Sequence, residues 1–592
     1  MRPRKSGSPS SNGEWGNRLP RATLALACVL GAAVTNTLGA QGLPRTQVRC
    51  SGQTITDVAI RTHAPDYGGL FSRTPPLERA VDALHTTTAP EVVRNFVLLK
   101  KGEPCSPLKR YETERILRAQ PFLAQANVTA FADGVDAVRI EVVTVDEPSL
   151  VAVVGIQRRA PPLHRLTLGS ANLGGQGVHA SASWRDGGEL RSQFGGRYSN
   201  YQLFGQPYQL HLNGSRRERG SDWSASVLLP FLTDVQGSAW RVGVARALDF
   251  VPYRRDSALA AGVGVDRTLG DVGAIARLGR PGRLALLGIS ATVERARVRR
   301  TPVTLGAEGE LPDSTPSLID AFESYRSARV NLLLGLRGVR FMRVQRFDAL
   351  NAEQDVRKGA QIGVALGRSL PFSEWDDDIY TAVGFYVGGG SLNSFAAFEG
   401  GAEGRRPLSG GDNDWNAMYM GGRAAMYFRP HDRHTITSSA EWSAAYRPRL
   451  PVQLSLADRR FGVRSYKQSN EGGARRLVLR SEERWYLGDV RGSADLGVTA
   501  FAESGRLWLG DAALGTNSAW RPAMGAGIVM AIPRRSQRLW RAEFAVPLAS
   551  GAGGKFEIRL SSADMTPRWW VEPHDLRRSG RRTALGDLFN WP

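Results

Sequence analysis

The sequence predicts a mainly β protein, in which a transmembrane antiparallel β-barrel of about 16 strands follows one small α+β domain. Three observations predict this class. From about residue 163 onward, segments of roughly ten residues alternate apolar and polar side chains between turns rich in Gly, Pro, Asp and Asn. The chain starts with the pattern of a secretion signal. No later stretch reaches the roughly 18 consecutive apolar residues that a spanning helix needs.

The N-terminus predicts a signal peptide over residues 1–40. Basic residues precede the apolar run Ala22–Val34, and small residues end at Ala40 before the polar Gln41. The mature protein is therefore expected outside the cytoplasm.

The formal net charge of +21 comes mainly from arginines that are spread along the alternating segments instead of forming one patch. Nucleic acid is therefore not expected as a partner. Outer-membrane lipid and lipopolysaccharide are the expected electrostatic partners.

Residues 50–150 predict the small α+β domain. "QTITDVAIRT", Gln53–Thr62, has the pattern of a strand. Helical spacing follows in "PLERAVDALH", "APEVVRNFVLLKKG" and "SPLKRYETERILRAQ". Two alternating segments, "LAQANVTAF" and "DAVRIEVVTV", are joined by the turn "ADGV" and close the domain.

Two cysteines remain after removal of the signal, because Cys28 lies inside it. We expect Cys50 and Cys105 to form a disulfide in the oxidising compartment outside the cytoplasm. Two unpaired thiols are the alternative, since the distance between the Cα atoms cannot be read from sequence.

Residues 163–564 form the predicted barrel, and residues 565–592 a C-terminal tail. The segment "LVLRSEERWYLG" illustrates the pattern, because Arg480, Glu482 and Arg484 share a face that is too charged for a packed core. A soluble sandwich also alternates, but about 400 residues of alternation behind a secretion signal favour a membrane barrel. Thr301–Ser327 and Ser391–Asn416 are expected as long external loops.

Enzymatic signals are weak. The glycine-rich "GAGGKF", residues 551–556, lacks the Ser or Thr that follows lysine in a phosphate-binding loop. "HDRH", residues 431–434, has no third metal ligand nearby. We expect no enzymatic activity, no cofactor and no metal site.

Several motifs occur in a recognisable order. "LHTTTAPEVVRNFVLLKKGEPC" and "RYETERILRAQPFLAQANV" are followed by "SANLGGQGVHASASW", and later by "FGVRSY", "SEERWYL", "FAESGRLW" and "RAEFAVPL". In this order the chain resembles the BamA/TamA-like superfamily of outer-membrane assembly and translocation proteins, in which periplasmic POTRA domains precede a 16-stranded barrel. "FGVRSY" lies where that superfamily has its VRG(F/Y) loop motif.

The chain departs from the superfamily pattern in four places. Ser465 replaces the glycine of the loop motif, and Glu503 stands where an aspartate is usual. A tail follows the last clear strand, and only one POTRA-sized region precedes the barrel.

The resemblance implies a protein of the bacterial outer membrane, with its N-terminal domain in the periplasm, that assists insertion or translocation of unfolded polypeptide clients. Periplasmic or lipoprotein partners are further candidates. The alternative function is a passive pore or surface-binding barrel whose periplasmic domain is only structural.

The candidate site is the lumen loop motif Phe461, Gly462, Val463, Arg464, Ser465 and Tyr466. We expect Arg464 to enter the lumen and pair with Glu503 or Glu482, near Arg484 on the same inner face. Phe461 and Tyr466 are expected to pack against the wall. The alternative is that these charges line a wet interior and contact only water.

Overall fold

The computed structural model describes residues 46–67, 85–156, 163–186, 192–255, 260–306, 309–371, 375–409, 414–458, 460–552, 554–564 and 576. The predicted signal peptide lies outside the described residues. So does the predicted tail, apart from Leu576. Met1–Thr46 forms one unit and Gln47–Pro592 a second, and the second contains two β-sheets.

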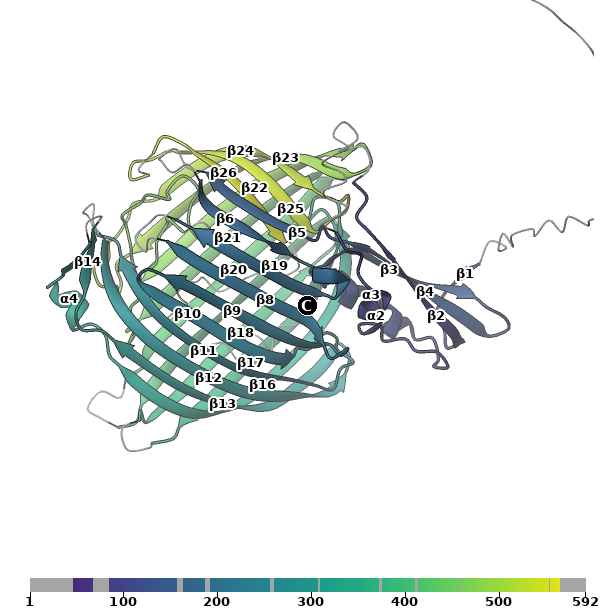
Figure 1. Cartoon of the computed structure of the whole chain (residues 1–592), viewed down its shortest axis with the longest axis horizontal. Coiled ribbons are helices and arrows are strands. Elements are labelled where there is room, and N and C mark those ends of the chain that lie inside the picture. The colour runs from purple at the N-terminus through teal and green to yellow at the C-terminus, as the bar shows by residue number, and fades with distance from the viewer. Residues whose placement is uncertain are drawn as a thin grey trace, which may run out of the picture. The chain divides into compact units, whose positions relative to one another are not determined.

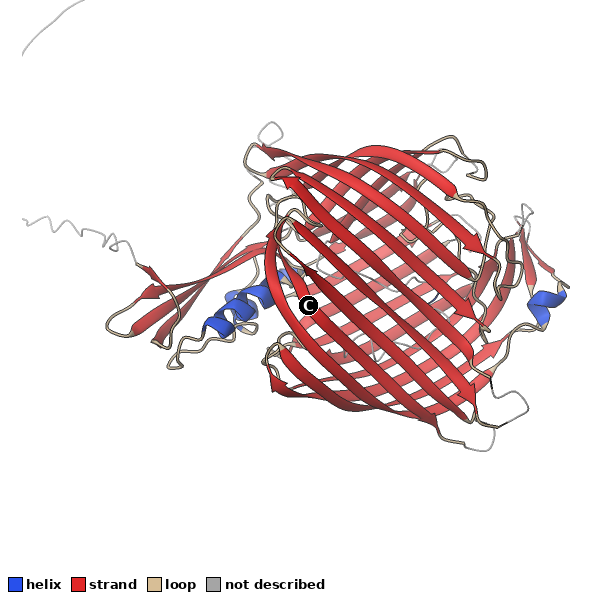
Figure 2. Cartoon of the chain, turned by 180° about the vertical axis from the view of Figure 1, so that it is seen from behind, coloured by secondary structure: helices blue, strands red, loops and turns tan. Residues whose placement is uncertain are grey.

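The smaller sheet has the strand order β1-β3-β4-β2 and includes one parallel pair, β2 with β4. Figure 2 shows its two helices as blue coils beside it. The α3 helix begins with Pro107 after the N-cap Ser106, whose side chain accepts a hydrogen bond from the backbone of Lys109. The elements are β1 (Gln47–Val48), β2 (Thr54–His63), α2 (Pro90–Arg94), α3 (Pro107–Arg118), β3 (Leu123–Ala132) and β4 (Ala137–Asp146).

One apolar core joins the helices to the small sheet, and it includes Val93, Leu117, Phe122 and Ile140, all fully buried. Cys50 and Cys105 lie in the same core and are joined by a disulfide, with Cα atoms 5.0 Å apart. That Cα separation is within the range that a disulfide requires.

The larger sheet is antiparallel throughout its described registers, and Figure 1 shows it rolled into a barrel-shaped wall. Its first strands are β5 (Leu150–Ile156), β6 (Leu163–Ser170), β7 (Val178–Arg185), β8 (Gln193–Leu203), β9 (Tyr208–Arg217), β10 (Gly220–Leu229), β11 (Ser238–Tyr253), β12 (Ala260–Arg280) and β13 (Arg283–Val298). A 3-10 turn, η2 (Leu173–Gly175), separates β6 from β7.

The second half continues the same meander after a short hairpin, β14 (Val303–Gly306) and β15 (Gly309–Pro312), and a helical turn, α4 (Pro316–Ile319). The later strands are β16 (Tyr325–Gln345), β17 (Glu353–Ser369), β18 (Asp378–Gly390), β19 (Ser394–Pro407), β20 (Asn416–His431), β21 (His434–Tyr446), β22 (Arg475–Val490), β23 (Ala494–Trp508), β24 (Arg521–Ala531), β25 (Arg538–Pro547) and β26 (Glu557–Asp564).

The expected strand number of about 16 is wrong for the described residues. The strand order of the large sheet contains 22 strands, of which β14 and β15 form only the short added hairpin. One reason is that Ser391–Asn416, expected as a long external loop, is largely the strand β19. The sheet also begins upstream of residue 163, because β5 already pairs with β6.

Side chains on the large sheet are distributed inside out relative to a soluble protein. On β16, Leu332, Leu334 and Leu336 point outward and are 38–63% exposed, whereas the alternate residues Asn331 and Arg337 are buried inside. A wall with apolar side chains outside and polar side chains inside is typical of membrane barrels. Among the described helices, none has the length and apolar character needed to cross a membrane.

Candidate functional site: the interior loop

The segment between β21 and β22, residues 447–474, crosses the interior of the large sheet. Gln453 exchanges hydrogen bonds with the backbone of Arg254, which follows β11, at 2.7 and 3.0 Å. Farther along the segment, the hydroxyl of Tyr466 lies 3.0 Å from the carbonyl of Pro522 in β24. The segment therefore contacts two parts of the wall that are far apart in the strand order.

Apolar residues hold this segment in place. Leu454, Leu456, Val463 and Tyr466 are at most 1% exposed and pack against inward residues of β20 to β24. Leu576, the one described residue of the tail, is fully buried in the same cluster. The segment is therefore fixed inside the wall and occupies part of the interior.

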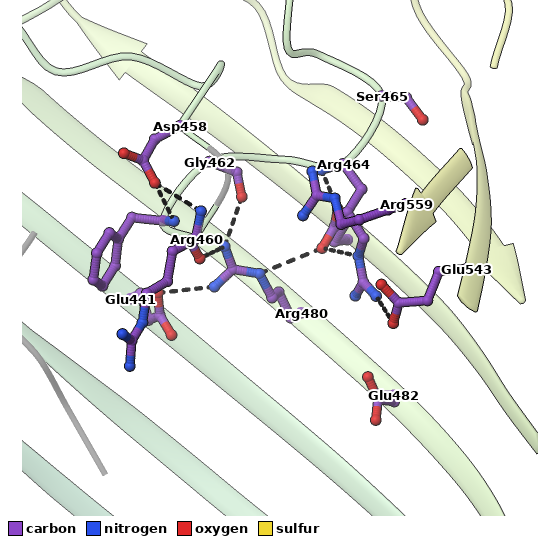
Figure 3. Close-up of polar contacts among 12 residues, drawn as sticks. Glu441, Asp458, Arg460, Gly462, Arg464, Ser465, Arg480, Glu482, Glu543 and Arg559 are labelled. Carbon is purple, nitrogen blue, oxygen red and sulfur yellow. Dashed lines mark hydrogen bonds and ion pairs between the residues drawn. The ribbon is translucent and has the colours of Figure 1, made fainter. Parts of the chain in front are cut away.

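Arg464 lies at the centre of an ion-pair network on the inner wall (Figure 3). Its Nε is 3.2 Å from Oε2 of Glu503, and its Nη1 is 2.9 Å from Oε1 of Glu543. Its backbone N–H also donates to Glu503, and the guanidinium carbon lies 3.3 Å from the centre of the Phe501 ring. The planar fork of arginine can serve two carboxylates and an aromatic face at once.

The neighbours of Arg464 fix the local backbone. A Cβ on Gly462 would lie 2.1 Å from the carbonyl oxygen of Leu456, so only glycine fits there. Tyr466 is fully buried, and burial raises the pKa of its hydroxyl. Phe461 is half-buried and stacks with Arg460 at 5.6 Å, and it does not belong to the buried cluster.

Ser465 is in a conformation that glycine adopts more easily. Its φ of 74° is in the left-handed region, and its hydroxyl is buried without a hydrogen-bond partner. Its backbone N–H donates to Glu557 at 2.7 Å, a contact that glycine would keep.

We expect Ser465→Gly to stabilise the folded barrel by about 1 kcal/mol, because it removes backbone strain and an unsatisfied hydroxyl. The midpoint temperature at which the barrel loses its fast gel mobility measures this change. Ser465→Ala, which removes the hydroxyl but keeps the Cβ, separates the two causes. A midpoint for Ser465→Gly at or below that of the parent would contradict this prediction.

Glu482 does not pair with Arg464, which corrects one expected contact. Its carboxylate lies 2.8 Å from Arg484 and 2.8 Å from Arg541. The register explains this. Glu503 lies opposite Arg480 on β22, whereas Glu482 is the next inward-facing residue of β22, two positions farther along the strand. Arg484 also donates to the backbone of Asp348, in the turn between β16 and β17.

Sequence reasoning missed most of the network's other members. Arg480 donates to the carbonyl of Gly462 at 2.6 Å and lies 2.8 Å from Glu441 and 3.3 Å from Glu503. Glu543 is the second partner of Arg464. Counting every second residue in "QRLWRAEFAVPL" would have placed Arg541 and Glu543 on one inner face.

A second ion-pair network joins helix α3 to the large sheet. Arg118 donates to both carboxylate oxygens of Asp355 on β17, at 2.7–2.9 Å. Glu114 lies 2.9 Å from Arg343 of β16. Arg115 donates to the carbonyl of Leu232, in the turn between β10 and β11. The small domain is therefore tied to several turns and strand ends of the large sheet.

No protein-family model matches the sequence, and no curated protein matches it. Similar solved structures include BamA from Haemophilus ducreyi lacking POTRA domains 1-3, at 12% identity over 86% of this chain and 84% of that chain, with a TM-score of 0.32. CdiB from Escherichia coli is 11% identical over 87% of this chain and 75% of that chain, with a TM-score of 0.42. The copper transporter OprC is 11% identical over 74% of this chain and 83% of that chain, with a TM-score of 0.33.

BamA and CdiB are thus among the solved structures to which the chain is similar.

Proposed function

We propose that the chain is an outer-membrane barrel that assists the insertion or translocation of polypeptides, without enzymatic chemistry. The observation that carries this proposal is the interior loop, which lies inside the wall and is fixed by Arg464, Glu503 and Glu543. A passive pore needs an open water path, and a loop anchored across the lumen works against one.

The membrane location is supported by the outward side chains. Leu287 and Ile289 on β13 are 49% and 61% exposed, and Leu332 and Leu336 on the neighbouring strand β16 continue the same apolar surface. Monomeric soluble proteins rarely expose apolar surface of this extent. We propose that this surface faces acyl chains, and that the small sheet is a POTRA-like domain in the periplasm.

The proposed path for clients uses strand edges. The strand order brings β26 next to β5, and these strands have 8 and 7 residues, against 21 in β12 and in β16. Short strands have few main-chain hydrogen bonds to break, so we propose that the wall closes and opens between β26 and β5. An extended client segment can add to an exposed strand edge there, or to the outer edge of β2 in the small sheet.

Reconstitution into liposomes tests this function. We expect the full-length protein to increase the rate at which an unfolded barrel client becomes protease-resistant in the vesicles, with little ion conductance. A pair of cysteines that locks β26 to β5 should abolish the increase, and reduction should restore it. High conductance with no effect on client insertion would instead indicate a passive pore.

A further inference from the structure

Four cations lie together on the outward face of β12, β13, β16 and β17, at one end of these strands. We call them the basic patch: Arg280, Arg283, Arg340 and Lys358. The turn between β12 and β13 lies at this end, and the backbone of its Gly282 donates to Asp234 at 3.0 Å. Asp234 belongs to the same turn as Leu232, which contacts α3. The basic patch is therefore at the end of the barrel that contacts the N-terminal domain.

The strand register makes the basic patch electrostatically unfavourable by itself. Arg280 lies directly opposite Arg283, and Arg340 lies directly opposite Lys358. Facing side chains on antiparallel strands have Cβ atoms about 5 Å apart, and like charges there destabilise the sheet. A bound anion would remove this repulsion.

No residue of the basic patch forms an ion pair with the described part of the chain, and Lys358 donates only to the carbonyl of Gly390. Several arginines elsewhere on the wall have carboxylate partners. Arg337, on the inner face of the same strand as Arg340, pairs with Asp234, and Arg246 on the outer face pairs with Asp266. The basic patch thus gathers four cations without ion-pair partners among the described residues on one face of neighbouring strands.

Space is available beside these cations. Gly338 is the outward residue two positions before Arg340, and a Cβ there would meet only two backbone oxygens, at 3.8 and 3.9 Å. Directly beyond it along the strand, Leu336 is 63% exposed, and Leu278 on β12 is 57% exposed. Apolar surface and unmatched cations therefore adjoin on one face.

We propose that the basic patch binds the phosphate groups of anionic phospholipid in the leaflet nearer the N-terminal domain, an inference that rests on the proposed membrane insertion. Acyl chains would cover the apolar residues, and arginine forks would meet phosphate oxygens with charge-assisted hydrogen bonds. Several cations at the membrane interface favour lipids with net negative charge over zwitterionic ones.

Native mass spectrometry of the full-length protein, released from bilayers that contain equal amounts of phosphatidylglycerol and phosphatidylcholine, tests the proposal. We expect the parent to retain phosphatidylglycerol preferentially. Replacing all four residues of the basic patch with glutamine should lower that preference about tenfold or more. The double variants R280Q/R283Q and R340Q/K358Q should each lose part of the preference for phosphatidylglycerol.

Two controls separate the effect of the patch from net charge and from shape. Glutamine at Arg49, Arg94, Lys100 and Lys101, four exposed cations of the N-terminal domain, makes the same charge change and should keep the preference. Replacing Arg280, Arg283 and Arg340 with lysine keeps the positive charge and should retain most of the preference for phosphatidylglycerol.

Two results would overturn the proposal: an equal loss of preference in the control variant, or an unchanged preference in the fourfold variant. Failure of the parent to enter bilayers would count against the proposed function itself.

Discussion

Replacing Arg464 with alanine is expected to destabilise the folded barrel by about 3 kcal/mol, near the lower end of the cost of breaking a buried ion pair. The change leaves the carboxylates of Glu503 and Glu543 buried at the point where they shared one guanidinium. Arg480 and Arg541 remain close to these carboxylates, and so they limit the loss. Heat-dependent gel mobility of the full-length protein in detergent measures the change.

Two further variants provide the comparison for the stability loss of Arg464→Ala. Arg464→Lys keeps the charge but cannot bridge two carboxylates, so an intermediate loss is expected. Arg368→Ala removes an outward ion pair with Asp377 and should cost no more than about 1 kcal/mol. If the Arg464 and Arg368 alanine variants lost stability equally, the interior network would not be what holds the loop.

The interior loop also has a functional consequence that conductance can follow. If Arg464 anchors the loop, its removal should increase ion conductance through planar bilayers, because the loop then leaves the lumen more often. The Arg368 variant should conduct like the parent. These measurements distinguish an anchor of the loop from a residue that only stabilises the wall.

Period-two counting was sufficient to place Glu503 and Glu482 on inner faces of their strands, because strand alternation decides which side chains face the interior. The loop motif that the chain resembles, not the counting, gave the expectation that Arg464 enters the lumen. The counting could not choose between Glu503 and Glu482. The two residues face the interior from neighbouring strands. Only the register shows that Glu503 lies opposite Arg480, whereas Glu482 lies opposite Phe501. Registers depend on turn geometry and packing, which one sequence does not specify.

The strand count was too low partly because Ser391–Asn416 was expected to be a loop. The segment that contains β19 is rich in Gly and Ser, residues that usually mark loops. In the folded sheet these glycines allow close approach: a Cβ on Gly400 would lie 2.8 Å from the carbonyl of Gly421 on β20. Small residues were therefore signs of tight strand packing, not of a turn.

Helix α3 shows a different limit of sequence reasoning. Its sequence places Glu112, Glu114, Arg115 and Arg118 within two turns, and such a charged face normally indicates contact with water. All four residues are buried, because the large sheet supplies partners from strands more than 100 residues away. The apolar spacing predicted the helix but gave no sign of this docking.

Breaking the contact between α3 and the sheet is the second large effect that we expect. Arg118 and Asp355 are 3% and 6% exposed and share a bidentate ion pair. Arg118→Ala should weaken docking of the small domain by about 3–5 kcal/mol, because it leaves the buried Asp355 carboxylate with the hydroxyl of Tyr111 in place of a cation. Limited proteolysis of the full-length protein, followed at the link between the small domain and β5, measures the docked fraction.

A double replacement decides whether the ion pair itself or the buried charge is responsible. Arg118→Leu with Asp355→Leu removes both charges of the pair and should recover much of the loss seen with Arg118→Ala, since Glu114, which also loses Arg118, keeps its ion pair with Arg343. Arg139→Ala is the matched control in the same domain, because its ion pair with Asp57 is exposed and should contribute at most about 1 kcal/mol. Equal cleavage rates for the Arg118 and Arg139 alanine variants would show that the pair does not hold the domain against the barrel.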